Sequence, residues 1–134
     1  MANPLNDIPE KPRPGPIRGT YWVRPGKLIA GPYPGSWLAS AARSRLDAIL
    51  GEDVDHFIDL TEPGEVGAYA GDLPESVTHK RYAIVDMDIP PDENMVEILD
   101  ALDAALEQDK TVYVHCLGGI GRTGTVIGCY LVRH

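Results

Sequence analysis

Short apolar runs along the chain alternate with longer stretches in which apolar residues recur every three or four positions. The short runs are bounded by turn-forming residues and predict β-strands. They lie on either side of a Pro-Gly turn within residues 21–30, and at residues 56–60, 77–85 and 111–114. A Pro-Gly pair suits the centre of a type II turn, so the first two strands should be tightly joined.

The first of the longer stretches predicts an amphipathic helix over residues 36–50. Four apolar residues recur in it at helical spacing: Leu38, Ala42, Leu46 and Ile49. Ser36 is a suitable N-cap, and Gly51 follows the last helical position. We interpret Trp37, near the start of this helix, as a packing residue rather than a surface for a ligand.

Two further helices follow by the same rule, one ending near Gln108 and one beginning near Arg122. Because strands alternate with helices, the pattern predicts an α/β fold with a central, mostly parallel sheet that carries helices on both faces. The length of 134 residues with 43% apolar content suits one domain. We assign it to residues 20–134 and expect the proline-rich residues 1–19 to form an extended arm, more in the manner of a flexible tail than of a docked segment.

Between the strand that ends at Val114 and the last helix lies a glycine-rich turn. It contains Gly118, Gly119 and Gly121 and joins Cys116 to Arg122. A strand that turns tightly into a helix directs its loop N–H groups to one point, which makes an anion-binding cradle. Glycines allow positive φ angles and the close approach of a ligand to bare amides. The spacing therefore predicts a phosphate site.

The residues around this cradle suit nucleophilic chemistry. The loop amides and the helix N-terminus would stabilise a thiolate at Cys116, which would then be a nucleophile at neutral pH. Arg122 can bind two oxygens of a phosphoryl group as charge redistributes in the transition state. Thr123 can donate a hydrogen bond to the sulfur as it leaves. The alternative is an inert cysteine at a strand end, but packing alone does not require Cys, Arg and Thr at these intervals.

At these residues the chain resembles the cysteine-dependent protein tyrosine phosphatase superfamily. His115, Cys116, Arg122 and Thr123 match its signature His-Cys-x5-Arg-Ser/Thr. The resemblance is strongest to the compact dual-specificity branch and covers residues 28–134. It implies a phosphatase-like fold that here lacks the further C-terminal helices of such domains. It also implies that a phosphate is bound by the loop between the nucleophile and the cation: Leu117, Gly118, Gly119, Ile120, Gly121 and Arg122.

The family uses an aspartate on a loop before the cysteine as general acid, and Asp86 lies at the matching position. Asp88 is the second candidate. The resemblance implies that Cys116 takes up the phosphoryl group while Asp86 protonates the leaving group, and that Asp86 then acts as base for water. His115 would lie behind the loop and hold its shape. No metal and no cofactor are required.

The loop interior, residues 117–121, contains no lysine or second arginine, whereas family members that act on highly charged lipids, inositol phosphates or RNA ends often place cations there. We therefore predict a phosphorylated protein or peptide as substrate. Phosphotyrosine alone and dual specificity both stay open. The alternatives are a phosphatase for a non-protein phosphate ester and a phosphopeptide-binding module without turnover. A disulfide-cycling arsenate reductase would need a resolving thiol, and Cys129 is better interpreted as a core residue.

The formal net charge of −8 argues against nucleic acids and anionic membranes as partners, because both bind to basic patches on proteins. No segment approaches the length of a membrane span, and the N-terminus does not begin with a basic and then an apolar stretch. Because a nucleophilic cysteine must stay reduced, we expect a cytoplasmic protein. The sequence leaves its oligomeric state open.

Overall fold

The computed structural model describes residues 13–86, 88 and 90–134 of the chain. Six strands form one sheet: β1 (Arg13–Pro14), β2 (Tyr21–Arg24), β3 (Leu28–Gly31), β4 (His56–Asp59), β5 (Thr78–Arg81) and β6 (Val112–His115). Three α-helices accompany them in the described part: α1 (Ala39–Leu50), α2 (Asp92–Glu107) and α3 (Gly121–Arg133). A short 3₁₀ helix, η2 (Ala70–Asp72), precedes β5.

The strand order in the sheet is β1-β2-β3-β6-β4-β5. Strands β3, β6, β4 and β5 are parallel to one another, whereas β2 pairs antiparallel with both β1 and β3. Gly26, with φ of 76°, makes the predicted turn between β2 and β3. The prediction of a mostly parallel sheet is therefore confirmed. The cysteine-bearing strand β6 lies between β3 and β4, so the turn after it opens at the centre of the sheet's carboxyl edge.

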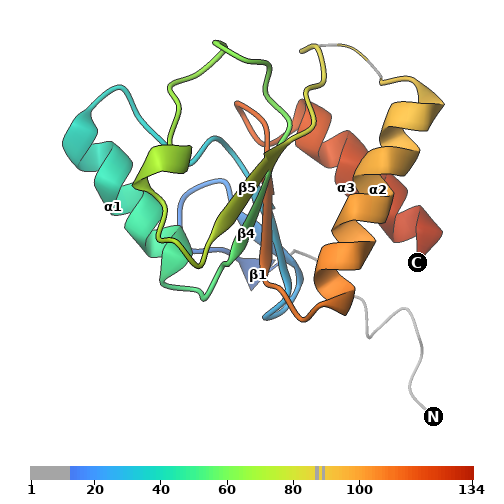
Figure 1. Ribbon diagram of the computed structural model, residues 1–134, viewed down its shortest axis with the longest axis horizontal. Helices are drawn as coiled ribbons and strands as arrows, with labels where there is room; N and C mark the ends of the chain where they lie inside the picture. Colours follow the sequence, from blue (N-terminus) through green and yellow to red (C-terminus); the bar gives the residue numbers. More distant parts are fainter. Residues whose placement is uncertain (1–12, 87, 89) are drawn as a thin grey trace.

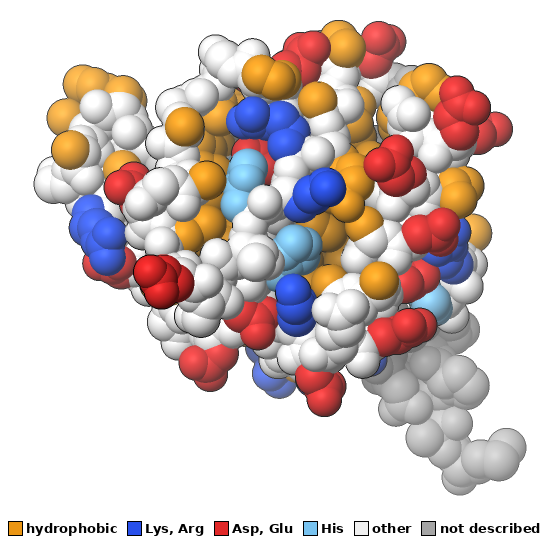
Figure 2. Space-filling model, in the orientation of Figure 1, with side chains coloured by type: hydrophobic (Ala, Val, Ile, Leu, Met, Phe, Trp, Pro, Cys, Tyr) orange, Lys and Arg blue, Asp and Glu red, His pale blue; other side chains and the backbone are white. Residues whose placement is uncertain are grey.

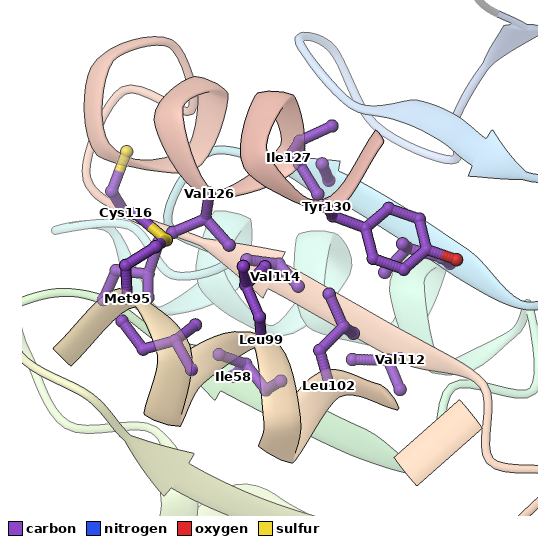
Figure 3. Close-up of a cluster of buried hydrophobic side chains, with 14 of the residues drawn as sticks. Ile58, Met95, Leu99, Leu102, Val112, Val114, Cys116, Val126, Ile127 and Tyr130 are labelled. Atoms are coloured by element: carbon purple, nitrogen blue, oxygen red, sulfur yellow. The ribbon is translucent and has the colours of Figure 1, made fainter. Parts of the chain in front are cut away.

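Helices cover both faces of the sheet, as predicted: α1 lies on one face, and α2 and α3 lie on the other (Figure 1). Side chains alternate between the faces along each strand. On β6, Val112 and Val114 point into the core with α2 and α3 (Figure 3), while Tyr113 packs in a second core beside α1 with Ile29 and Phe57. These two cores hold the central strands rigidly below the loops of the carboxyl edge.

The first helix begins three residues later than predicted. It starts at Ala39 after Leu38, and Ser36 does not cap it; the Ser36 hydroxyl accepts a hydrogen bond from the Leu38 amide within the preceding turn, at 3.2 Å. Trp37 consequently lies outside the helix and is 91% exposed, so its interpretation as a packing residue was wrong. Leu46 and Ile49 face the core as predicted, whereas Leu38 is 49% exposed.

The predicted strand over residues 77–85 is regular only at β5, which forms one edge of the sheet. Beyond it the Ile84 amide still donates to the Leu60 carbonyl at 3.0 Å, so the chain stays extended toward Asp86. Arg13 and Pro14, at the described end of the predicted arm, pair with β2 rather than standing free of the sheet; residues 1–12 lie outside the described residues. No helix in the described part of the chain is both long and apolar enough to cross a membrane.

Candidate active site

The turn after β6 curls around the sulfur of Cys116. The Gly119 amide donates a hydrogen bond to Cys116 Sγ at 3.2 Å, and Cys116 is 2% exposed. Figure 3 shows this side chain at the end of β6, with its sulfur directed away from α2 and toward the turn that enters α3. The turn thus directs a backbone N–H donor at the sulfur.

The close fit of this turn against β3 depends on glycine at position 119. Its φ is 77°, and a Cβ there would lie 2.4 Å from the carbonyl carbon of Gly31. The turn is also tied to the segment after β3, because the Tyr33 amide donates to the Leu117 carbonyl at 3.0 Å. The turn is thus packed against the neighbouring strand, which fixes where its amides point.

Arg122, in the first turn of α3, is buried and held by an acid that sequence reasoning missed. Its two terminal nitrogens donate to the two carboxylate oxygens of Glu65 at 2.7 and 2.6 Å, and Nη1 also donates to the Ile84 carbonyl at 3.0 Å. The hydrogen bonds from Arg122 hold the pKa of Glu65 below its ordinary value despite its partial burial. A bidentate pair of this kind fixes the plane of the guanidinium.

Asp86 lies beside the same guanidinium. Its Oδ1 is 3.5 Å from Arg122 Nε, and its side chain is 60% exposed. Asp88, the second candidate, is exposed, and its amide donates to the Val85 carbonyl at 3.1 Å. The fold thus brings Asp86 to the cradle across a large separation in sequence, at the position that the family pattern indicated.

His115 lies fully buried behind the turn. Its Nδ1 is 3.0 Å from the Cys116 carbonyl oxygen, which can only accept, so Nδ1 carries the proton and Nε2 is an acceptor. The Tyr69 hydroxyl supplies the donor to Nε2. Burial lowers the pKa of His115 to about 4, although Asp59 acts in the opposite direction. The imidazole is therefore neutral at neutral pH and braces the Cys116 backbone.

A buried carboxylate, Asp59, lies next to this histidine at the end of β4. It accepts hydrogen bonds from His79 at 2.9 Å and from the amide of Thr61 at 2.9 Å, and Arg81 lies 3.5 Å away. Although burial raises its pKa, the bonds from His79 and Thr61 hold that pKa well below its ordinary value. His79 is thus part of a structural network behind the cradle.

Thr123 is completely buried beside the cradle in α3, and among the described residues its hydroxyl has no hydrogen-bond partner. The other cysteine, Cys129, packs against the core formed by α2 and α3, as predicted, and both cysteines are free thiols. In the described ranges, no cluster of three or more His, Cys, Asp or Glu side chains is arranged to hold a metal ion.

Glu65, Tyr69 and Asp59 are the site residues that the sequence analysis missed. Each contacts a residue of the signature from a position 46 or more residues earlier in the chain. The one signal was topological: Asp59 ends a buried strand, and Glu65 and Tyr69 follow it on the loop at the same carboxyl edge as the cradle.

Comparison with known proteins identifies this arrangement. The family described as "Polymorphic toxin system, DSP-PTPase phosphatase" matches residues 34–134. The chain belongs to this family. Its resemblance to cysteine-based protein tyrosine phosphatases of the dual-specificity kind, inferred above from the signature, is thereby confirmed, and the chain has the fold of these phosphatases.

The relatives that the chain matches are larger proteins. The chain is 29% identical to the mouse (Mus musculus) protein tyrosine phosphatase domain-containing protein 1 over 132 residues, covering 87% of this chain and 17% of that protein. It is 30% identical to the zebrafish (Danio rerio) dual specificity protein phosphatase CDC14AB over 123 residues, covering 84% and 19%. The chain thus spans less than a fifth of these curated relatives.

Solved structures show the same fold. The active form of the phosphatase Tk-PTP superimposes with a TM-score of 0.68 at 26% identity, covering 80% of this chain and 68% of that one. A mutant form of Tk-PTP gives a TM-score of 0.72 at 24% identity, covering 86% and 71%. The compact α/β sheet with helices on both faces is therefore the phosphatase fold.

Proposed function

We propose that this phosphatase hydrolyses phosphotyrosine monoesters in proteins or peptides through a cysteinyl-phosphate intermediate. The observation that carries the proposal is the position of Asp86, 3.5 Å from the guanidinium that Glu65 holds at the cradle. This proximity supports the role of Arg122 as the cation and of Asp86 as the proton donor on a separate loop. Hydrolysis of phosphoserine and phosphothreonine by the same residues is the wider form of this proposal.

Two displacements follow from this geometry. The Cys116 thiolate attacks phosphorus, an S–P bond forms, and the bond to the tyrosine oxygen breaks as Asp86 donates its proton to that oxygen. In the second step Asp86 takes a proton from water, the water oxygen bonds to phosphorus, and the S–P bond breaks to release phosphate and the thiolate. Arg122 and the loop amides bind the phosphoryl oxygens in both steps, and the unpartnered hydroxyl of Thr123 is available to the departing sulfur.

The substrate class is supported by the cradle's composition. Residues 117–121 carry no charged side chain, so Arg122 is the one cation that the segment from Cys116 to Thr123 offers a phosphate. A single monoester needs no more, whereas a ligand with several phosphates would leave its further charges without partners. Because Cys116 must stay reduced, we expect the protein to act in a reducing compartment such as the cytoplasm.

The test is hydrolysis of a phosphotyrosine peptide by the parent chain and by three variants, with a metal chelator present. Cys116→Ser should abolish phosphate release. Asp86→Ala should slow it about a hundredfold to ten-thousandfold, as the loss of a general acid does, and Asp88→Ala is the matched control on the same loop. The Asp86→Ala loss should shrink with p-nitrophenyl phosphate, because its leaving group needs a proton less than the tyrosine phenolate does, whose ordinary pKa is about 10.

A phosphate adduct on the Cys116 peptide after rapid acid quenching would identify the intermediate directly. Release of phosphate by Cys116→Ser at the parent rate would contradict the mechanism. A folded parent chain that binds a phosphopeptide but releases no phosphate would instead show a binding module.

A further inference from the structure

The rim of the candidate active site is apolar, which bears on the choice of substrate. Four loops follow the parallel strands at the carboxyl edge of the sheet, and their described parts are residues 32–38, 60–69, 82–86 with 88 and 90–91, and 116–120. Among the described residues, eight large hydrophobic side chains are exposed, and five of them lie on these loops. We name these five the apolar rim: Trp37, Leu38, Val85, Leu117 and Ile120.

The most exposed members of the rim lie on two different loops of the carboxyl edge. Trp37 is 91% exposed just before α1, and Ile120 is 84% exposed in the turn that holds the sulfur. Figure 2 shows hydrophobic side chains gathered over the N-terminal end of α1, at the upper left, and further ones along the upper edge of the molecule where the loops lie. Single exposed apolar residues are ordinary, but a group concentrated around one site marks a binding surface.

Charge narrows what this surface accepts. The described parts of the four loops contain no lysine or arginine, and they carry the acids Glu62, Glu65, Asp86 and Asp88. Acidic side chains next to the phosphoryl group of a substrate would therefore be repelled, and so would the headgroups of an anionic membrane. The apolar and acidic rim therefore favours substrates in which uncharged, apolar residues flank the phosphoresidue.

A cavity of about 370 Å³ lies beside the rim. Its walls come from Tyr33, from Ala39, Ala42 and Leu46 of α1, and from Tyr69 and the chain before it, while the charged Arg43 and Asp72 also line it. Tyr33 joins this cavity to the cradle, because its amide bonds the Leu117 carbonyl at 3.0 Å and its ring lies 6.3 Å from that of His115. A side chain a short distance along a bound peptide from the phosphoresidue could enter this cavity.

We infer that the substrate is a protein segment whose phosphoresidue is flanked by large apolar side chains, seated on the apolar rim, with one of them in the cavity beside α1. This inference rests on the proposed phosphatase function and specifies its substrate. The energy of burying each flanking side chain on the rim contributes to binding and holds the phosphoryl group in line with Cys116.

The experiment compares three phosphotyrosine peptides that differ only in the residues on either side of the phosphotyrosine. In the apolar peptide these residues are Leu and Phe, in the second peptide both are Ser, and in the third both are Glu. The parent chain should cleave the apolar peptide with a kcat/KM at least about tenfold above the Ser peptide, with the Glu peptide lowest. Trp37→Ser should reduce the apolar preference at least about threefold. The matched control is Val132→Ser, because Val132 is 88% exposed near the end of α3, away from the rim loops.

Ala39→Gln provides a second variant. Ala39 is exposed at the start of α1 and lines the cavity, so the longer side chain should block the cavity without entering the core. The apolar preference should fall again, while the kcat/KM for p-nitrophenyl phosphate stays at the parent value in all three variants, because that substrate is too small to reach Trp37 or the cavity.

Equal kcat/KM values for the apolar and Ser peptides would overturn the inference, as would equal effects of Trp37→Ser and Val132→Ser. The parent chain could also release phosphate faster from phosphatidylcholine vesicles containing a phosphatidylinositol monophosphate than from any peptide. If that rate depended on Trp37, the inference would be overturned in favour of a membrane surface. Failure of the parent chain to release p-nitrophenol would contradict the proposed function itself, whereas release without discrimination among peptides would contradict only this inference.

Discussion

The cation of the site depends on a carboxylate from a distant loop. Arg122 is 2% exposed at its side chain, and Glu65, 18% exposed, binds both of its terminal nitrogens. A buried guanidinium that loses such a partner keeps its desolvation cost and gains rotational freedom. Under the proposed function Glu65 is a positioning residue, because it would orient the donors of Arg122 that bind the phosphoryl group.

Glu65→Gln tests this role. We expect the free energy of unfolding to fall by about 2 kcal/mol, because the charge of Arg122 loses its closest partner. We expect kcat/KM to fall about tenfold to a hundredfold through misplacement of the guanidinium. Chemical denaturation and steady-state kinetics measure the two effects. Glu62→Gln is the control on the same loop, since Glu62 contacts Glu65 through its backbone amide, which the substitution keeps. An unchanged kcat/KM in Glu65→Gln would show that Glu65 does not position Arg122 for the reaction.

His115 makes stability depend on pH. Its folded pKa of about 4 lies below the ordinary value of 6.5, with burial as the largest cause, so the unfolded chain binds this proton more readily than the folded one. The contribution of His115 to the free energy of unfolding is therefore fully present above about pH 6.5. It decreases as the pH falls below that value and stops changing below about pH 4. The difference amounts to about 3 kcal/mol.

The measurement is the free energy of unfolding between pH 4 and pH 8 for the parent chain and for His115→Asn. An asparagine can still donate to the Cys116 carbonyl but does not titrate, so the parent should lose more stability than the variant over this range. Parallel curves for the two proteins would show that the folded state takes up the proton on His115 as easily as the unfolded one does.

At the scale of elements, the geometry of the cradle depends on the contact between two turns. Gly119 follows β6 and Gly31 ends β3, and these strands are parallel neighbours in the sheet. A positive φ and a backbone contact coincide at Gly119, so both the conformation and the space require glycine there. Gly118, one residue earlier, has open space where its Cβ would be.

Gly119→Ala should therefore be damaging and Gly118→Ala mild. For Gly119→Ala we expect a loss of about 2 kcal/mol or more in unfolding free energy, since the new Cβ meets backbone that cannot rotate away. The turn should move away from β3 and carry the loop amides with it, which should lower kcat by about a hundredfold. Thermal unfolding of the two variants, measured side by side, checks the stability difference. Similar melting temperatures would show that the turn has room to relax.

The sequence predicted the parts of the site that are close together in the chain. Cys116 and Arg122 are joined by one turn, so their spacing alone determines their relation, and the apolar runs were enough to place β6 and α3. Asp86 was located by resemblance to a family pattern. Glu65 and Tyr69 could not be found in this way, because their side chains reach the signature only after β4, β5 and β6 have paired.

The start of α1 shows the opposite error, in which a local rule was overridden by the fold. Ser36 has the chemistry of an N-cap, yet the segment before α1 is held by Arg45, which donates to the carbonyls of Tyr33 and Gly35 at 2.8 and 3.2 Å. These tertiary bonds keep residues 33–38 in a loop above the sheet. Trp37 is consequently exposed at the rim rather than packed in the core, which no helical periodicity could indicate.

At the scale of the whole molecule, the net charge sets how substrates approach. The formal charge of the chain is −8, so under the proposed function the mean field opposes a phosphorylated ligand, whereas the loop amides and Arg122 would attract it at short range. Salt screens the long-range part over about 10 Å at 0.1 M, and it weakens the contacts inside the buried cradle much less. Ionic strength therefore separates the two contributions.

We expect kcat/KM for a phosphotyrosine peptide with Glu neighbours to rise severalfold between about 10 and 200 mM NaCl, because screening removes repulsion without weakening the buried contacts. A peptide of the same length with Lys neighbours should show the opposite slope, since screening removes its attraction to the acidic surface. For a peptide with Leu neighbours kcat/KM should rise less than for the Glu peptide, because only its phosphoryl group is repelled. Initial rates at low substrate concentration measure kcat/KM directly for all three. A fall in kcat/KM for the Glu peptide would mean that the short-range cation, rather than the charge of the whole molecule, controls the encounter.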